Sequence, residues 1–462
     1  GLVGSEMCIR DSINTIAQNI DGKWYGLLQV PGQKLRIELD IEKSSLGYKS
    51  IMYSLDQSDQ GVPAGKTKFV DSVLRIKIAM GFIQYTGTFK DSVFIGEFKQ
   101  FGQKFPLTLT RQYIEKQIVH RQQEPSQPYP YTTEDVSFFN SKDSVMLSGT
   151  LSKPLGNDKY PVVILISGSG PQNRDEEIAN HKPFLVLADY LTKKGIAVLR
   201  YDDRGFGKST GCHACATTMD FASDVESAMK FLKSSSDIDT FKIGLIGHSE
   251  GGMIAPIVAS GVKDVNFMVL LAAPGILLED IIKDQNEQYL RAVNESETKI
   301  AITNETTTQT IKIVKNAKTE KQAKSELSKY MKKTTKRNKI MIPEGLSRKE
   351  FIRMYVSEYA SIWMMYALNY DPAPALEKIK CPVFALNGEK DLQVSKEKNL
   401  ELIKTIINRG GNQQVTIKSY QNLNHLFQEC KTGSPSEYAA IEQTFSPVVM
   451  DDIIYWIKSI IQ

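Results

Sequence analysis

The sequence has little of several residue types, and each scarcity argues against a class of protein. It contains five cysteines in 462 residues, and such an odd, sparse set does not make a disulfide framework. No run of about 18 apolar residues occurs, so we expect no transmembrane span. The net charge is only +4, whereas a nucleic-acid partner usually needs a concentrated basic face, so we expect none. Hydrophobic residues make up 41% of the chain, which provides a core large enough for an enzyme.

The beginning of the chain shows no signal peptide. Residues 1–12 resemble a translated sequencing adapter, so we expect them, including Cys8, to be non-native. A signal peptide could have been lost together with the true N-terminus.

Cys212 and Cys215 form a C-x-x-C pattern that encloses His213. Such a pattern can be a redox pair or half of a zinc site. No second C-x-x-C or H-x-x-H follows, so we expect a thiol pair in a loop, free or disulfide-linked. We expect neither a metal nor a cofactor.

The sequence pattern of residues 13–112 predicts an all-β domain. Segments such as Lys34–Ile41 and Val73–Ile78 alternate apolar and polar residues, which is the period of a half-buried strand. Turn residues separate them at even spacing, which favours a small antiparallel barrel or sandwich. Residues 113–130 are polar and proline-containing, and they are typical of an extended linker.

Residues 131–462 follow a different pattern, in which continuous apolar strands alternate with helices. Val162–Ile166 is the first such run, as expected for a strand buried on both faces. The alternation predicts an α/β fold with a mostly parallel, doubly wound sheet. It pauses at about 275–371, which is helix-rich, and we interpret this interruption as an inserted helical lid.

Gly247-His248-Ser249-Glu250-Gly251 fits the pattern G-x-S-x-G. An apolar strand precedes it and a helical stretch follows. In this context the two glycines allow a cramped turn that lifts the serine hydroxyl clear of the sheet. We predict that Ser249 is a nucleophile; the alternative is a structural glycine turn with an incidental serine.

A serine hydroxyl needs a base, and histidine is the usual one. Of the five histidines, only His425 lies in a polar turn after a late strand, at the edge of the sheet where a base must sit. The acid that orients it should follow an earlier strand, and Asp391 fits, with Glu389 as its main rival.

The order Ser249, Asp391, His425 is typical of one fold, and residues 131–462 resemble the α/β-hydrolase superfamily. The resemblance is closest to its bacterial esterase and serine aminopeptidase-like branch. Four segments carry it: Ser167–Pro171, Tyr201–Ser209, the serine motif and Gly388–Val394. The β-rich N-terminal part also resembles the leader domain of some secreted members.

The resemblance implies an oxyanion hole of two backbone N–H groups. One should come from Glu250 and the other from the loop after the first core strand, most simply from Ser169, with Gly170 as the alternative. The Asp-Asp-Arg-Gly loop resembles a loop of the same family, in which we expect Arg204 to brace the loops around the site; a direct contact with the substrate is the alternative.

Two parts of the expected lid have a distinctive composition. Lys312–Lys339 carries eleven Lys and Arg residues against two Glu, which we interpret as a solvated helical face; recruitment of an anionic partner is the alternative. In Phe351–Leu368, aromatic residues recur at helical spacing. Among them, Tyr359, Trp363 and Tyr366 are candidates for an apolar wall along an acyl chain, or for packing of the lid.

These observations predict a serine esterase that hydrolyses a small carboxylic ester through an acyl-enzyme. One alternative is an aminopeptidase acting on short peptides or aminoacyl amides. Another is a catalytically inactive binding protein that works through its β domain. The leader-domain resemblance also implies export from the cytoplasm, while the oligomeric state stays open.

Overall fold

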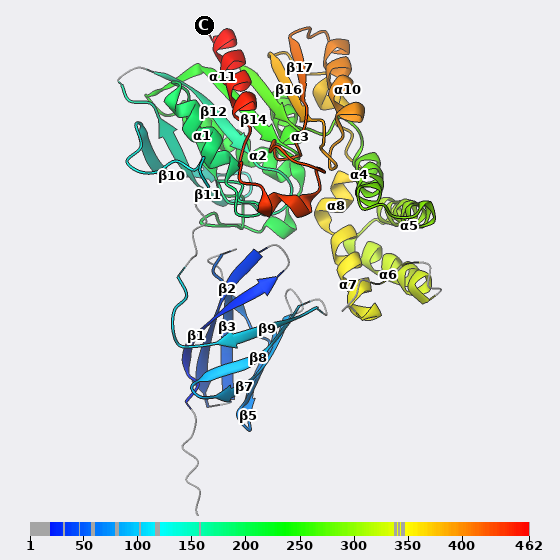
Figure 1. Cartoon of the computed structure of the whole chain (residues 1–462). Coiled ribbons are helices and arrows are strands. Elements are labelled where there is room, and N and C mark those ends of the chain that lie inside the picture. Colours follow the sequence, from blue (N-terminus) through cyan, green and yellow to red (C-terminus); the bar gives the residue numbers. More distant parts are fainter. Residues whose placement is uncertain are drawn as a thin grey trace, which may run out of the picture. The chain divides into compact units, whose positions relative to one another are not determined.

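The structure is a computed structural model that divides into two compact units. It describes residues 19–30, 33–45, 47–56, 61–78, 83–100, 103–115, 121–156, 159–336, 340, 342 and 347–461. One unit comprises Gly1–Val30 and Lys34–Lys116, and the other comprises Pro31–Gln33 and Gln117–Gln462 (Figure 1). Residues 1–12, which we expect to be non-native, lie outside the described residues. None of the helices in the described part of the chain is long and apolar enough to cross a membrane.

The first unit is an antiparallel sheet that nearly closes into a barrel. Its strands are β1 (Gly22–Val30), β2 (Gln33–Ser44), β3 (Gly47–Ser54), β4 (Val62–Pro63), β5 (Lys66–Val70), β6 (Val73–Ile78), β7 (Ile83–Lys90), β8 (Val93–Gln100) and β9 (Gln103–Leu109). They pair in the order β1-β2-β3-β5-β6-β7-β8-β9, with β4 on β3. Backbone hydrogen bonds of 2.7 and 2.8 Å between Tyr25 and Thr110 connect β1 to the residue after β9. Of the two architectures left open by the sequence, the barrel is the one observed.

Local sequence explains the strands and turns of this barrel. In β6, Leu74, Ile76 and Ile78 alternate with exposed residues and point into the core. The turn Asp71-Ser72, which joins β5 to β6, has φ angles of 52° and 58°, as a two-residue hairpin with the right twist requires.

The second unit contains a mixed sheet. Its strands are β10 (Thr132–Asn140), β11 (Val145–Lys153), β12 (Tyr160–Ile166), β13 (Ala197–Tyr201), β14 (Ile238–His248), β15 (Phe267–Leu271), β16 (Val383–Gly388) and β17 (Val415–Tyr420). Their order is β10-β11-β13-β12-β14-β15-β16-β17. The first two pairings are antiparallel and the remaining ones are parallel, which confirms the predicted mostly parallel sheet.

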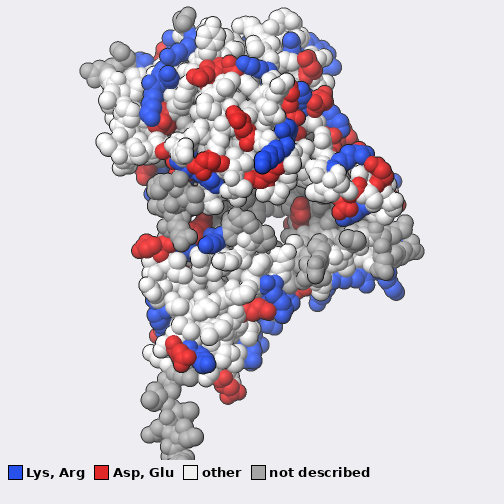
Figure 2. Space-filling view, in the orientation of Figure 1, with Lys and Arg blue, Asp and Glu red and all other residues white. Residues whose placement is uncertain are grey.

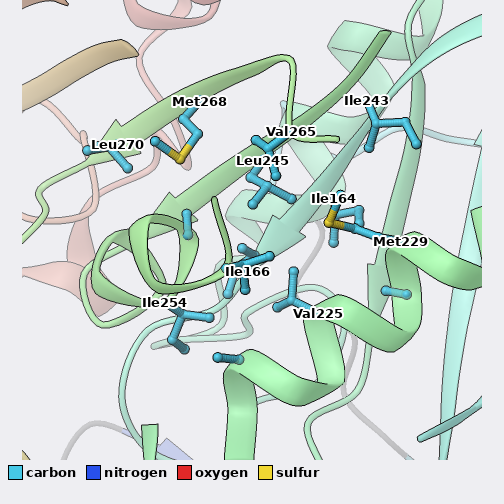
Figure 3. Packing of buried hydrophobic residues seen from close by; sticks show 14 of the residues in the cluster. Ile164, Ile166, Val225, Met229, Ile243, Leu245, Ile254, Val265, Met268 and Leu270 are labelled. Carbon is cyan, nitrogen blue, oxygen red and sulfur yellow. The ribbon is translucent and has the colours of Figure 1, made fainter. Parts of the chain in front are cut away.

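Helices cover both faces of this sheet. On one face, α1 (Pro183–Lys193) and α11 (Pro447–Ile461) pack over a buried apolar cluster. On the other face, α2 (Thr218–Lys233), α3 (Gly251–Gly261) and α10 (Lys396–Arg409) pack over a second cluster. Figure 3 shows part of the second cluster, in which Val225 and Met229 of α2 approach Ile164 and Ile166 of β12. This double burial explains why the central strands are apolar throughout.

A helical insertion separates β15 from β16. It consists of α4 (Leu278–Ala292), α5 (Glu297–Asn316), α6 (Glu320–Lys336), α7 (Arg348–Tyr359), α8 (Ile362–Ala367) and α9 (Ala373–Leu376). In α6, Ala323, Leu327 and Met331 are buried while the lysines are exposed, as expected for a solvated helical face. Figure 2 shows charges of both signs interspersed over much of the visible face of the second unit.

The expectation of one helical period through Phe351–Leu368 is wrong. Helix α7 ends at Tyr359, and Ser361 begins α8, where its hydroxyl accepts a hydrogen bond from the Met364 N–H. Serine favours this capping position because its oxygen replaces a missing backbone acceptor. The aromatic residues before and after this break therefore do not form one continuous stripe.

Candidate active site

Ser249 occupies a strained turn between β14 and α3. Its φ angle of 53° is rare for a residue that has a side chain. A Cβ at Gly247 would lie 2.1 Å from the Gly251 carbonyl oxygen, and one at Gly251 would lie 2.1 Å from the Ile166 carbonyl oxygen. Only glycine fits at both positions, which is the physical reason for the G-x-S-x-G spacing. The Ser249 N–H donates to the Leu271 carbonyl at 2.9 Å and ties the turn to β15.

Asp391 and His425 form a buried hydrogen-bonded pair at the carboxyl edge of the sheet. The His425 Nδ1 lies 2.8 Å from Asp391 Oδ2, and the two side chains are 5% and 0% exposed. The other oxygen, Asp391 Oδ1, accepts the N–H groups of Gln393 and Val394 at 2.8 and 2.9 Å. These bonds fix the carboxylate and, through it, the orientation of the imidazole.

His248, the residue before Ser249, joins the serine turn to His425. The two imidazole rings are 4.7 Å apart, and His248 Nε2 lies 3.0 Å from the His425 carbonyl oxygen. Within the described part of the chain, the Ser249 hydroxyl itself makes no hydrogen bond to the His425 ring. Catalytic hydrogen bonds are commonly long in a site without substrate and tighten when it binds.

The rival acid, Glu389, lies outside this cluster. Its carboxylate binds Lys396 and the Ser419 hydroxyl, and its side chain is 30% exposed. The structure therefore brings Asp391, and not Glu389, to the imidazole.

The loop after β12 lies directly beside Ser249. A Cβ at Gly168 would be 3.2 Å from the Ser249 Cβ. The Gly168 N–H is already bound, because it donates to Glu176 Oε1 at 2.7 Å. It therefore cannot also face a substrate oxygen, which leaves Ser169 and Gly170 as the candidate donors of this loop.

Glu250 precedes the first turn of α3, where backbone N–H groups have no intrahelical acceptor. Its side chain is buried, and its Oε1 accepts hydrogen bonds from the Thr218 hydroxyl at 2.7 Å and from Trp363 Nε1 at 2.6 Å. Burial raises the pKa of the Glu250 carboxyl, although both hydrogen bonds oppose the shift. The Trp363 contact connects the helical insertion to the serine turn.

The other two aromatic candidates form ring pairs of their own. Tyr359 stacks on Tyr355 with ring centroids 4.5 Å apart, and Tyr366 stacks on Tyr370 at 5.9 Å. Of the three, only Trp363 has a described hydrogen bond to a residue of the serine motif.

A second carboxylate, that of the partly buried Asp203, lines a small pocket beside the serine turn. Glu250, Gly168 and His213 also line this pocket. Burial raises the pKa of Asp203 well above its ordinary value, and the bonds from the Ser167 hydroxyl and the Gln172 N–H oppose the shift. Among the described residues, neither Asp203 nor Glu250 forms an ion pair.

The loops around the pocket are braced by Arg204, in agreement with the structural role predicted for it. Its guanidinium binds Asp224 at 2.7 Å and Asp143 at 2.8 Å, and it also reaches the Asp220 carbonyl oxygen. Arg204 and Asp224 are both buried.

Cys212 and Cys215 form a disulfide, one of the two states expected for the loop pair. His213, between them, stacks on the Phe221 ring at 4.9 Å, and burial lowers the pKa of His213 to about 4. No group of three or more His, Cys, Asp or Glu side chains is arranged to hold a metal ion in the described ranges.

Sequence reasoning missed the roles of Glu176 and His248. Glu176 Oε1 lies 2.9 Å from His248 Nδ1, and both residues are buried. Burial opposes the charged form of His248, but the Glu176 carboxylate and the His425 carbonyl outweigh it and raise the pKa of His248. A separation of 72 positions leaves no local pattern from which this contact could have been found.

The comparisons with known proteins agree with this architecture. The family model for serine aminopeptidase, S33, matches residues 182–429, which is more than half of the chain. Esterase EstD of Thermotoga maritima is 28% identical over 327 residues, covering 70% of this chain and 68% of that protein. The uncharacterized protein YfhR of Escherichia coli K12 is 29% identical over 126 residues, covering 27% and 41%.

Solved structures that match part of this chain include an esterase from Pyrococcus furiosus. It is 18% identical and covers 76% of this chain and 100% of its own, with a TM-score of 0.44. Est1E from Butyrivibrio proteoclasticus is 13% identical and covers 71% and 98%, with a TM-score of 0.39. On the match of the family model, the chain belongs to the serine aminopeptidase S33 family of α/β-hydrolases.

Proposed function

We propose that this protein is a carboxylic ester hydrolase that works through an acyl-enzyme on Ser249. The observation that carries the proposal is the buried Asp391–His425 pair, hydrogen-bonded at 2.8 Å beside the strained serine turn. Membership of a hydrolase family and the similarity to a protein named as an esterase support it.

In the first half-reaction, Ser249 Oγ attacks the ester carbonyl carbon while His425 Nε2 takes the hydroxyl proton. Asp391 holds the imidazole in the tautomer that leaves Nε2 free to accept, and it stabilises the resulting imidazolium. The carbonyl oxygen becomes an oxyanion, which the N–H groups of Glu250 and of Ser169 or Gly170 stabilise. Each such donor is typically worth about a hundred- to thousandfold in rate.

Collapse of this intermediate breaks the bond to the alcohol, and the departing oxygen takes the proton from His425. A water molecule then gives its proton to His425 and attacks the acyl carbon. The second collapse releases the acid and restores the Ser249 hydroxyl. We propose that the helical insertion acts as a lid, with Trp363, Tyr359 and Tyr366 lining the acyl side.

Asp203 and Glu250 favour a second candidate, an aminopeptidase acting on short peptides or aminoacyl amides. Glu250 is buried and Asp203 is partly buried, neither forms an ion pair among the described residues, and the ammonium group of a substrate would supply the missing cation. We prefer the ester hydrolase, because the Glu250 carboxylate already accepts hydrogen bonds from Thr218 and Trp363.

The deciding experiment compares p-nitrophenyl esters of increasing acyl length with aminoacyl-4-nitroanilides. We expect ester turnover to exceed amide turnover. The reverse order would replace the first proposal by the second.

Labelling with a fluorophosphonate probe tests whether the protein is an enzyme at all. Wild type should be labelled and Ser249→Ala should not. Ser260→Ala is a matched control, because Ser260 lies at the far end of α3 and its hydroxyl donates to the Ile257 carbonyl of the same helix. A folded wild-type protein that resists labelling would indicate a catalytically inactive binding protein.

A further inference from the structure

Glu176 and His248 connect the two halves of the catalytic machinery. Glu176 Oε1 accepts the Gly168 N–H at 2.7 Å and lies 2.9 Å from His248 Nδ1. On the other side of its ring, His248 Nε2 lies 3.0 Å from the His425 carbonyl oxygen. One chain of hydrogen bonds thus runs from the loop after β12 to the loop that carries the base, and its two bonds to His248 are buried.

The partners of His248 determine how many protons its ring carries. A carbonyl oxygen has no hydrogen to donate, so Nε2 must carry a proton to bond to His425. Glu176 Oε1 accepts from Gly168, and an ionised carboxylate can only accept, so beside the ionised Glu176 the Nδ1 atom carries a proton as well. Only the imidazolium form has both protons, since a neutral ring has one.

The surroundings of the ring supply the matching negative charge. Glu176 is 1% exposed and His248 is 5% exposed, so an unpaired charge on either would be costly. The charged groups that face His248 are Glu176 from the loop after β12 and Asp391 from the loop after β16, next to the His425 ring. The raised pKa of His248 agrees with this pairing.

We propose that Glu176 and His248 are a buried carboxylate–imidazolium pair. The charge of this pair holds His425, and the loop after β12 that should supply an oxyanion donor, in position relative to Ser249. Both are positioning residues, because neither has to touch the substrate. The inference rests on the proposed function in that it assigns these two residues a part in the same reaction.

Glu176→Gln is the sharpest variant because it keeps the shape and removes the charge. A neutral His248 has one N–H group and can donate to only one of its two partners. Either the bond to the His425 carbonyl or one of the bonds of residue 176, to His248 or to the Gly168 N–H, is therefore lost. Small displacements of catalytic groups can reduce rates by about a hundredfold. We expect kcat on the best p-nitrophenyl ester to fall roughly ten- to hundredfold, with KM within about twofold.

Glu177→Gln is the matched control, since Glu177 is the next residue and binds Asn173 instead. It should leave kcat within about twofold of wild type. If Glu176→Gln also keeps wild-type kcat, an uncharged acceptor is sufficient and the proposal is wrong.

A second measurement does not depend on activity or on the folding of the Glu176 variant. Nitrogen-15 spectra of histidine-labelled wild-type protein contain only five imidazoles, and His248→Gln identifies the signal of interest. We expect both ring nitrogens of His248 to be protonated at pH 7.5. A neutral tautomer at that pH would overturn the proposal even if the esterase assay succeeds. Conversely, absence of ester hydrolysis would contradict the proposed function. The spectrum would still show whether Glu176 and His248 form a charged pair.

Discussion

Asp391→Asn is the change whose consequence the structure specifies most fully. The new amide has one acceptor and one donor in place of two acceptors. Two backbone N–H groups, from Gln393 and Val394, point at one oxygen, whereas His425 Nδ1 and, at 3.3 Å, the Asn387 amide point at the other. Turned towards the backbone, the NH₂ group would meet two fixed donors at 2.8 and 2.9 Å. Turned towards His425, it meets a ring that can change its tautomer and an Asn387 amide at the longer distance of 3.3 Å, so the amide oxygen stays with the backbone. The amide NH₂ then faces His425.

In that orientation the imidazole must accept at Nδ1, which places its proton on Nε2. Nε2 can then no longer take the proton of Ser249. Trapping the wrong tautomer in this way lowers kcat by about 10⁴-fold, equivalent to about 5.4 kcal/mol of barrier. The loss should appear in kcat, because the substrate does not touch Asp391.

The assay is p-nitrophenyl ester hydrolysis at saturating substrate, with thermal unfolding measured in parallel to show that the variant folds. Glu389→Gln is the control, and it should lose less than about twofold, because Glu389 binds Lys396 and Ser419 on the surface. If a folded Asp391→Asn protein keeps more than about a tenth of wild-type kcat, the assignment of the orienting acid is refuted.

Three further changes test other parts of the site. Gly168→Ala places a methyl group 3.2 Å from the Ser249 Cβ, so fluorophosphonate labelling should slow by about tenfold or more, and labelling at the wild-type rate would contradict this. Arg204→Ala leaves Asp224 buried without its cation and should lower the free energy of unfolding by about 3–5 kcal/mol in urea titrations; a loss under about 1 kcal/mol would contradict it. His213 has a folded-state pKa of about 4, below its ordinary value of 6.5. Between these pH values the unfolded chain binds more protons than the folded one, so the free energy of unfolding should fall as the pH falls from 6.5 to 4. His213→Gln should flatten that dependence in urea midpoints measured at pH 5 and 7.5, and an unchanged slope would count against it.

The sequence by itself determined the fold class and the types of most elements. Strand β14 and helix α3 are visible as an apolar run, a glycine-flanked serine and a helical stretch, because periodicity and glycine report local backbone geometry. The apolar strand expected before the serine motif runs from Ile238 to His248, so it includes the first two residues of that motif. Chain order also singled out Asp391 and His425 for the loops that follow β16 and β17.

Only the tertiary structure decided which side chains meet. The contact of Glu176 with His248, and that of His248 with the His425 carbonyl, span 72 and 177 positions, and no periodic pattern extends over such separations. The same holds for Trp363, whose bond to Glu250 crosses from the insertion to the serine turn. The hydrophobic pattern of a strand is local and predicts which of its faces is buried. The charge of a buried group depends instead on residues that are distant in the sequence and come close only when the chain packs.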